Sequence, residues 1–144
     1  MDGSLADKLQ LDLLGAHEKL AKYDPINLNG FAKLCHEDNA KWWVDPETGE
    51  DWRNNKLALG SKIALIHSEI SEALEGLRKG IPDEKLPDRS AEEVELVDAL
   101  IRIFDYAAAR KLDLDGAFWE KRAYNLKRAD HKVENRVKEG GKKF

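Results

Sequence analysis

The fold is decided by residues 55–80, which read NKLALGSKIALIHSEISEALEGLRKG. Apolar residues recur here every three or four positions, the spacing of one face of an α-helix. Asn54 or Asn55 can cap the first turn, and Gly80 followed by Pro82 ends the last one. We therefore predict one long helix from Leu57 to Gly80 with a buried stripe formed by Leu59, Ile63, Ile66, Ile70, Ala73, Leu74 and Leu77.

A second helix is predicted from about Ala91 to Arg110, and it starts with a capping box formed by Ser90 and Glu93. Apolar residues cover most of its circumference, namely Val94, Val97, Leu100, Ile101, Phe104, Ala107 and Ala108. A helix that is apolar nearly all round is expected to be mostly buried. Its polar residues form one narrow stripe, which we expect to face a pocket or an interface: Glu95, Asp98, Arg102 and Asp105.

Each of these helices carries two acids three residues apart, Glu69 and Glu72 on the first and Glu95 and Asp98 on the second. Positions three apart lie on one helix face, so neighbouring helices would bring four carboxylates together. Four carboxylates share a small volume only when cations are present. Mg²⁺ is the expected cofactor, with Mn²⁺ as a substitute, because hard cations prefer carboxylate oxygens.

Other interpretations of these acids stay open. Glutamates three apart are common on solvated helix surfaces, and Arg102 can pair with Asp98 and Asp105 along its own helix. A di-iron carboxylate site is less favoured, because such sites use Glu-x-x-His on two helices. None of the four histidines in this chain has a glutamate three residues before it.

The rest of the chain adds helical patterns at about 4–22, 28–43 and 115–129, followed by a basic tail at 131–144. The sequence shows no alternating strand pattern. Helices joined by short loops are typical of antiparallel bundles. We predict a single all-α domain over residues 1–144, an antiparallel four-helix-type bundle with an N-terminal extension helix within residues 1–25 and a mobile tail.

The composition narrows the classes of partner. The chain has 144 residues, 36% of them charged, and a formal net charge of -4, which argues against binding to nucleic-acid polymers. A bound divalent cation can still attract a phosphate ligand. No apolar run approaches the ~20 residues that cross a bilayer. The single cysteine, Cys35, fits a reducing compartment. We expect a cytoplasmic protein without a membrane partner.

Three blocks of sequence carry a family resemblance: Leu65–Gly80 (LIHSEISEALEGLRKG), Glu93–Ala107 (EVELVDALIRIFDYA) and the residues from Glu120 onward. The order E-x-x-E, a spacer, then E-x-x-D resembles the MazG-like nucleoside triphosphate pyrophosphohydrolases, within the all-α NTP pyrophosphohydrolase superfamily. The resemblance begins at about Phe31. One departure is Ser68, where many members carry an acid. This form looks like that of small relatives encoded by phages or bacteria, which implies a bacterial or phage-infected cell.

The resemblance implies Mg²⁺-dependent hydrolysis of an NTP or dNTP to the monophosphate and diphosphate, and with it a role in adjusting the dNTP pool. It assigns catalysis and metal binding to Glu69, Glu72, Glu95 and Asp98. It also implies substrate contacts, for which the candidates are Asn125, Arg128, Lys121, His131, His36 and Trp52.

The resemblance further implies an oligomer, so a homodimer or homotetramer is expected. The broad apolar arc of residues 94–108 agrees, because one small bundle cannot cover it. Two alternatives stay open for the function. One is a hydrolase of the same fold that acts on another phosphoanhydride, such as a phosphoribosyl-nucleotide. The other is a non-catalytic helical protein that binds a partner.

Overall fold

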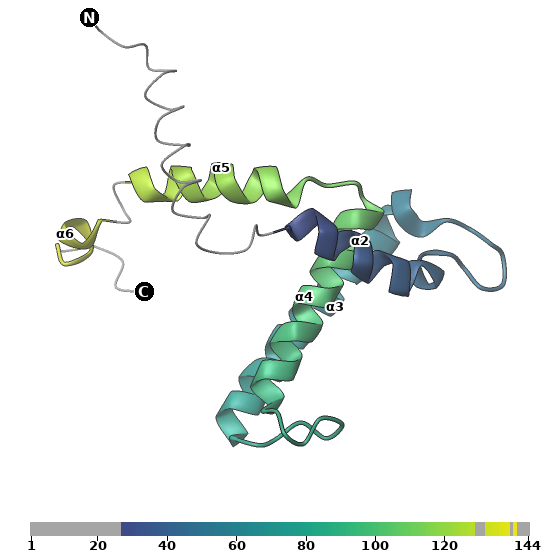
Figure 1. Cartoon of the computed structure of the whole chain (residues 1–144), viewed down its shortest axis with the longest axis horizontal. Helices are drawn as coiled ribbons and strands as arrows, with labels where there is room; N and C mark the ends of the chain where they lie inside the picture. Colours follow the sequence, from purple (N-terminus) through teal and green to yellow (C-terminus); the bar gives the residue numbers. More distant parts are fainter. Residues whose placement is uncertain (1–26, 129–131, 139, 141–144) are drawn as a thin grey trace, which may run out of the picture.

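The computed structural model describes residues 27–128, 132–138 and 140, and within them every regular element is helical (Figure 1). The only β-type pairings there are two isolated bridges, Val44 with Asp51 and Pro82 with Ser90. The all-α prediction is confirmed for this part, and the predicted N-terminal helix lies outside the described residues. The elements are α2 Leu28–Asn39, η1 Ala40–Trp43, η2 Trp52–Asn54, α3 Lys56–Lys79, α4 Ala91–Ala109, α5 Leu114–Lys127 and α6 Val133–Arg136.

The ends of α3 are set by local chemistry, as the sequence predicts. The Asn55 side chain accepts hydrogen bonds from the backbone N–H groups of Leu57 and Ala58, which have no partner inside the helix. At the other end Gly80 adopts φ +62°, a left-handed conformation that a residue without a Cβ takes at no steric cost. The capping box at the start of α4 is also present, since Ser90 and Glu93 bond to each other's backbone N–H groups.

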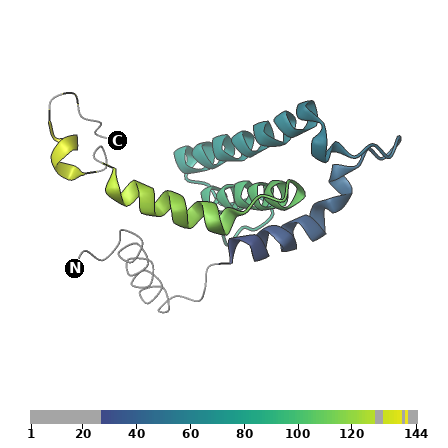
Figure 2. The same cartoon turned by 90° about the horizontal axis from the view of Figure 1, so that it is seen from above.

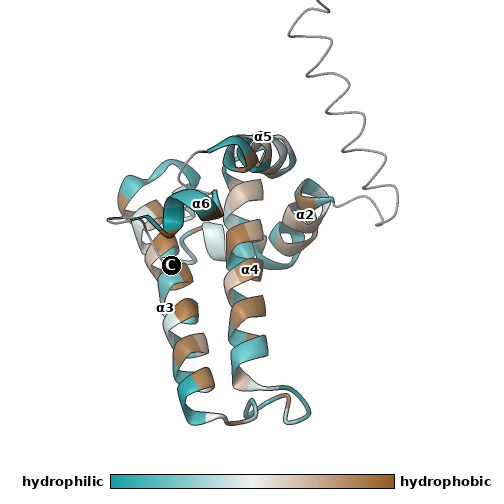
Figure 3. Cartoon of the chain, turned by 90° about the vertical axis from the view of Figure 1, so that its left-hand side faces the viewer, coloured by the Kyte–Doolittle hydropathy of each residue, from teal (hydrophilic) through white to brown (hydrophobic). Residues whose placement is uncertain are grey.

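Helix α4 lies between α3 and α2 (Figure 3). Helices α3 and α4 run side by side in opposite directions, as the view from above also shows (Figure 2). Their closest approach near the connecting loop depends on Gly76, where a Cβ would stand 2.8 Å from the backbone N of Glu92. A glycine there allows the two backbones to approach closely.

Helix α5 leaves the C-terminal end of α4 and extends away from the α3–α4 pair (Figures 1 and 2). Its start is held to the start of α2 by reciprocal caps. The Asp115 carboxylate accepts from the backbone N–H groups of Leu28 and Asn29, while the Asn29 side-chain oxygen accepts from the N–H of Leu114. Each helix thus supplies acceptors for the unpaired N–H groups of the other.

The buried interior of the described chain is small and consists mainly of alanines, together with Trp43. The prediction of a mostly buried helix over residues 94–108 holds for residues 103–108, which are buried or half-buried, and is wrong for residues 96–102, where Leu100 is 48% exposed. The predicted stripe of α3 is also largely open, and Leu74 is 65% exposed. The physical reason is that α3 has a helical neighbour on one side only (Figure 3). None of the described helices is long and apolar enough to span a bilayer.

Candidate metal centre

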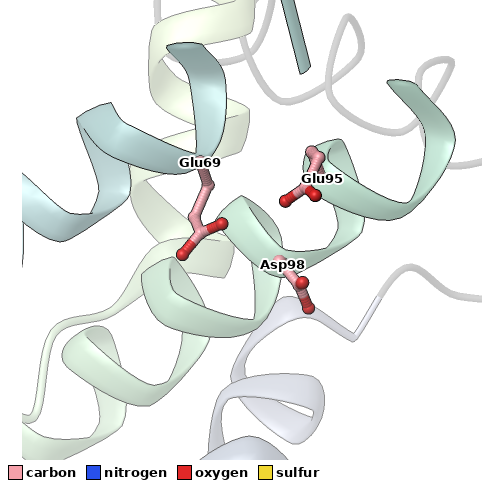
Figure 4. A group of neighbouring side chains, drawn as sticks. All are labelled: Glu69, Glu95 and Asp98. Atoms are coloured by element: carbon pink, nitrogen blue, oxygen red, sulfur yellow. The ribbon is translucent and has the colours of Figure 1, made fainter. Parts of the chain in front are cut away.

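Three of the four predicted carboxylates meet between α3 and α4 (Figure 4). Glu69 comes from the middle of α3, and Glu95 and Asp98 come from the first half of α4. One oxygen atom from each side chain lies within 4.8 Å of the others. The i,i+3 spacing puts the two acids of α4 on one face, and the antiparallel pairing places Glu69 opposite them.

The cluster is costly in electrostatic terms when no cation is bound. Glu69 is only 6% exposed, Glu95 is half-buried and Asp98 is open to solvent. Burial raises the pKa of Glu95, and contact with the Glu69 carboxyl and the charges of Glu72 and Asp98 raise it further. Each of these causes disfavours the ionised form of Glu95. A cation bound to the cluster would reverse that preference.

Arg102 supplies one positive charge to this cluster. Its Nε donates to Glu69 Oε1 across the helix pair at 2.5 Å. The structure therefore does not contain the ion-pair ladder along α4, in which Arg102 would pair with Asp98 and Asp105. Glu95, Asp98 and Arg102 of α4 lie near Glu69 of α3, so the ion pair of Arg102 runs between helices.

Glu72 is exposed and does not belong to the converging cluster, although its charge raises the pKa of Glu95. Ser68, the departure from the family pattern, donates its hydroxyl proton to the backbone oxygen of Leu65 at 2.7 Å. The converging set of donors is therefore Glu69, Glu95 and Asp98, all of them carboxylates. Such an all-oxygen set suits Mg²⁺ or Mn²⁺, and three protein ligands leave coordination positions for water or a phosphate.

A cavity of about 460 Å³ adjoins the cluster. Asp98 and Arg102 form part of its wall, so the cavity and the carboxylate cluster share residues. The rest of the lining comes from α2, η1, α3 and α4, and includes Asn39, Trp42, Trp43 and Lys62. The two cationic side chains and the exposed ring of Trp42, beside the carboxylate cluster, are groups that suit a phosphorylated aromatic ligand.

Sequence reasoning did not single out Lys62 or Asn39. Lys62 lies two helical turns before Glu69, and this spacing of seven residues is the signal that could have placed it on the same face of α3. Its Nζ donates to the backbone oxygen of Trp42 at 2.9 Å and stands 4.6 Å from the ring centre of Trp43. Burial lowers the pKa of Lys62, an effect that the negative charge of Asp105 partly opposes.

Two predicted substrate contacts, His36 and Trp52, do not line this cavity. His36 places Nδ1 at 2.7 Å from the buried carboxylate of Asp105, which also accepts from Trp43 Nε1 at 2.9 Å. Trp52 is half-buried in η2, before the start of α3. Asp105, which the sequence pattern placed on the polar stripe of α4, thus anchors the aromatic wall of the cavity.

Of the other predicted substrate contacts, Lys121 and Asn125 lie on α5 and Arg128 is its C-cap, and α5 extends away from the α3–α4 pair (Figure 1). Lys121 and Arg128 stand over the ring of Tyr124, at 4.9 Å and 5.9 Å from its centre. Asn125 Oδ1 is shielded from solvent, and no described residue donates a hydrogen bond to it. Within one chain the structure does not bring these side chains to the cluster, and His131 lies outside the described residues.

Glu69, Glu95 and Asp98 could hold a metal ion, and the cavity beside them is lined by cationic and aromatic side chains. Comparison with known protein families, with curated proteins and with solved structures finds no match for this chain.

Proposed function

We propose that this chain is a Mg²⁺-dependent pyrophosphohydrolase that converts a nucleoside triphosphate and water into the monophosphate and diphosphate. The observation that carries the proposal is the convergence of Glu69, Glu95 and Asp98 within 4.8 Å, next to a cavity whose wall includes Asp98, Arg102 and the exposed ring of Trp42. The sequence resemblance points to the same reaction independently of this geometry.

In the proposed reaction, the oxygen of a water molecule attacks the α-phosphorus and forms the new P–O bond. The bond from the α-phosphorus to the α–β bridging oxygen breaks, and diphosphate leaves with that oxygen and its electron pair. One carboxylate of the cluster accepts a proton from the attacking water. Mg²⁺ held by Glu69, Glu95 and Asp98 would neutralise charge on the phosphate oxygens and lower the pKa of bound water. Glu72, one turn after Glu69, is available to bind the proposed metal directly or through a bound water.

The cavity supplies a place for the rest of the substrate. Trp42 is 59% exposed on its wall and offers a ring face to a base. Asn39, half-buried on the same wall, carries both a donor and an acceptor for a polar edge. The resemblance assigns further contacts to Lys121, Asn125 and Arg128, and in this arrangement they require a second copy of the chain or a movement of α5.

We also propose that the chain acts as a homo-oligomer, a dimer or a dimer of dimers. The support is the apolar surface that the described helices leave open on α3 and α4, which is more than isolated surface residues account for. Pairing these faces between two copies would form a four-helix bundle from two chains, whereas the sequence predicts such a bundle within one chain.

The test is diphosphate release from each common ribo- and deoxyribonucleoside triphosphate, measured with Mg²⁺ and with excess chelator. We expect release with Mg²⁺ only, and a loss of about 100-fold or more in kcat for Glu69→Gln and for Asp98→Asn. Glu75→Gln is the matched control, because Glu75 lies on α3 but pairs with Arg78 and Lys79 at the surface.

Two results would replace the proposal with its alternatives. Release of diphosphate or phosphate from a phosphoribosyl-nucleotide, but from no triphosphate, would assign another phosphoanhydride as substrate. Wild-type protein that binds no Mg²⁺ and releases nothing from any of these compounds would leave the non-catalytic partner-binding protein.

A further inference from the structure

Arg102 is the residue that joins the carboxylate cluster to the cavity. Its Nε is hydrogen-bonded to Glu69, and the side chain also forms part of the cavity wall. The Glu69 carboxylate is almost fully buried, whereas the Arg102 side chain is 42% exposed. The two terminal nitrogens of the guanidinium have no hydrogen-bond partner among the described residues.

This geometry differs from that of a purely structural counter-ion. A buried carboxylate that only needs neutralising is best served by a bidentate arginine, which uses two parallel N–H bonds. Arg102 uses one N–H, and its two terminal nitrogens carry the remaining four donors in the fixed plane of the guanidinium. Planar guanidinium groups with free donors match the oxygens of phosphate groups.

Lys62, the other cationic side chain that lines the cavity, already contacts protein groups. Lys62 donates to the backbone oxygen of Trp42 and lies against the ring of Trp43. Of the two cationic side chains that line the cavity, Arg102 therefore has the donors to spare. Asp98, one turn before Arg102 on α4, places the proposed metal next to these donors.

We propose that Arg102 is a substrate-binding residue, whose terminal nitrogens donate to non-bridging phosphate oxygens of the triphosphate while Nε holds Glu69 in place. This inference rests on the proposed function, because it takes the metal centre as the anchor of the phosphates. It adds a direct contact that the sequence pattern does not assign, since the pattern pairs Arg102 with the acids of its own helix.

The double role has a measurable signature. Glu69 is both the partner of Arg102 and a proposed metal ligand, so Arg102 competes with the metal for negative charge. Removing Arg102 should leave Mn²⁺ binding unchanged or stronger, and it should weaken the binding of a polyphosphate. A merely structural arginine would not separate these two affinities in this way.

The experiment uses the full chain and inorganic probes. Mn²⁺ affinity is measured alone, and tripolyphosphate affinity is measured by calorimetry in the presence of Mn²⁺. We expect Arg102→Gln to weaken tripolyphosphate binding by about tenfold or more, with Mn²⁺ affinity no lower than in the wild type. Arg102→Lys keeps the charge but not the planar donors, and it should show a smaller loss of several-fold. Arg78→Gln, an exposed arginine of α3, is the control and should match the wild type.

The inference is overturned if Arg102→Gln and Arg102→Lys bind tripolyphosphate as tightly as wild type while the wild type binds both probes. If Arg102→Gln does not fold, an unchanged affinity in Arg102→Lys is sufficient to reject it. Failure of the proposed function gives a different result. In that case the wild type binds no Mn²⁺, or Glu69→Gln binds Mn²⁺ as well as the wild type does. Either result rejects the metal centre and, with it, the inference about Arg102.

Discussion

At the scale of single residues, two acids of α4, the buried Asp105 and the half-buried Glu95, differ in their surroundings. The Asp105 carboxylate has two hydrogen-bond partners, the side chains of Trp43 and His36. The neighbours of Glu95 are other carboxyl groups, and burial adds to the cost of its charge. Asp105 is held within the fold by these two partners, whereas the surroundings of Glu95 disfavour its ionised form.

Glu95→Gln should therefore stabilise the metal-free protein at neutral pH by on the order of 1 kcal/mol, the ordinary size of a single-residue effect. The pKa of Glu95 is raised in the folded state, so its favourable contribution is complete below its ordinary value of 4.5. That contribution is lost as the pH rises through the raised pKa. Thermal unfolding in chelator, at acidic and neutral pH, measures the difference between variant and wild type.

The same variant should lose most of the stabilisation that added Mg²⁺ gives to the wild type, because a proposed ligand is gone. Equal melting temperatures for the variant and the wild type at neutral pH in chelator would contradict the electrostatic account of Glu95.

Trp43→Phe should destabilise the protein by about 1–3 kcal/mol. Trp43 is the largest fully buried side chain of the described residues, and its Nε1–H donates to both carboxylate oxygens of Asp105. Phenylalanine keeps most of the ring but leaves a buried carboxylate short of a donor. Urea unfolding gives the free energy, and Trp42→Phe, on the exposed side of η1, is the control. A loss no larger than that of the control would show that the Asp105 contact is dispensable.

At the scale of elements, glycine has opposite roles at two positions of α3. Gly76 is buried against the start of α4, where an added Cβ would lie 2.8 Å from the N atom of Glu92 and 2.9 Å from Ala91 Cβ. A Cβ at Gly60 would meet nothing within 4 Å among the described residues. The first glycine serves the packing of two helices, and the second only weakens its helix.

Gly76→Ala should therefore cost about 1–3 kcal/mol through overpacking, and Gly60→Ala should gain about 1 kcal/mol through helix propensity. The pair is a matched test within one helix, read from chemical denaturation of both variants. A stabilising Gly76→Ala would mean that α3 and α4 are further apart at this end than the structure places them.

At the scale of the whole molecule, the described helices form an open arrangement rather than a closed core. Large apolar side chains of α3 and α4 are exposed, and α5 projects from one end of the α3–α4 pair (Figure 1). A small chain that leaves so much apolar surface exposed gains most from association with a second copy.

Light scattering after size exclusion should therefore give a mass of at least twice the 16.3 kDa of one chain. A double variant, Leu74→Glu with Leu100→Glu, should shift the mass to that of a monomer, since charges buried at an interface carry a large desolvation cost. Glu84→Lys, in the loop before α4, is a charge change away from these faces and should leave the mass unaltered. A wild-type monomer at micromolar concentration would refute the proposed assembly.

The sequence by itself determined the helical elements, because their signals are local. Asn55, Gly80 and the Ser90–Glu93 box act within a few residues of where they stand, so α3 and α4 start and end close to the predicted positions. Helix 28–43 was predicted in one piece, and the structure divides it into α2 and a 3₁₀ turn. The i,i+3 spacing of Glu95 and Asp98 likewise predicts that they share one helix face, without any knowledge of how the helices pack.

Only the tertiary structure decided how these faces meet. The rotation of α3 against α4 brings Glu69 into the cluster and leaves Glu72 outside it, and it turns Arg102 toward Glu69 instead of toward Asp98. The cavity needs α2, η1, α3 and α4 together, so no single stretch of sequence contains its signal. Helical periodicity states which residues share a face, but the partner of that face depends on packing between segments far apart in the chain.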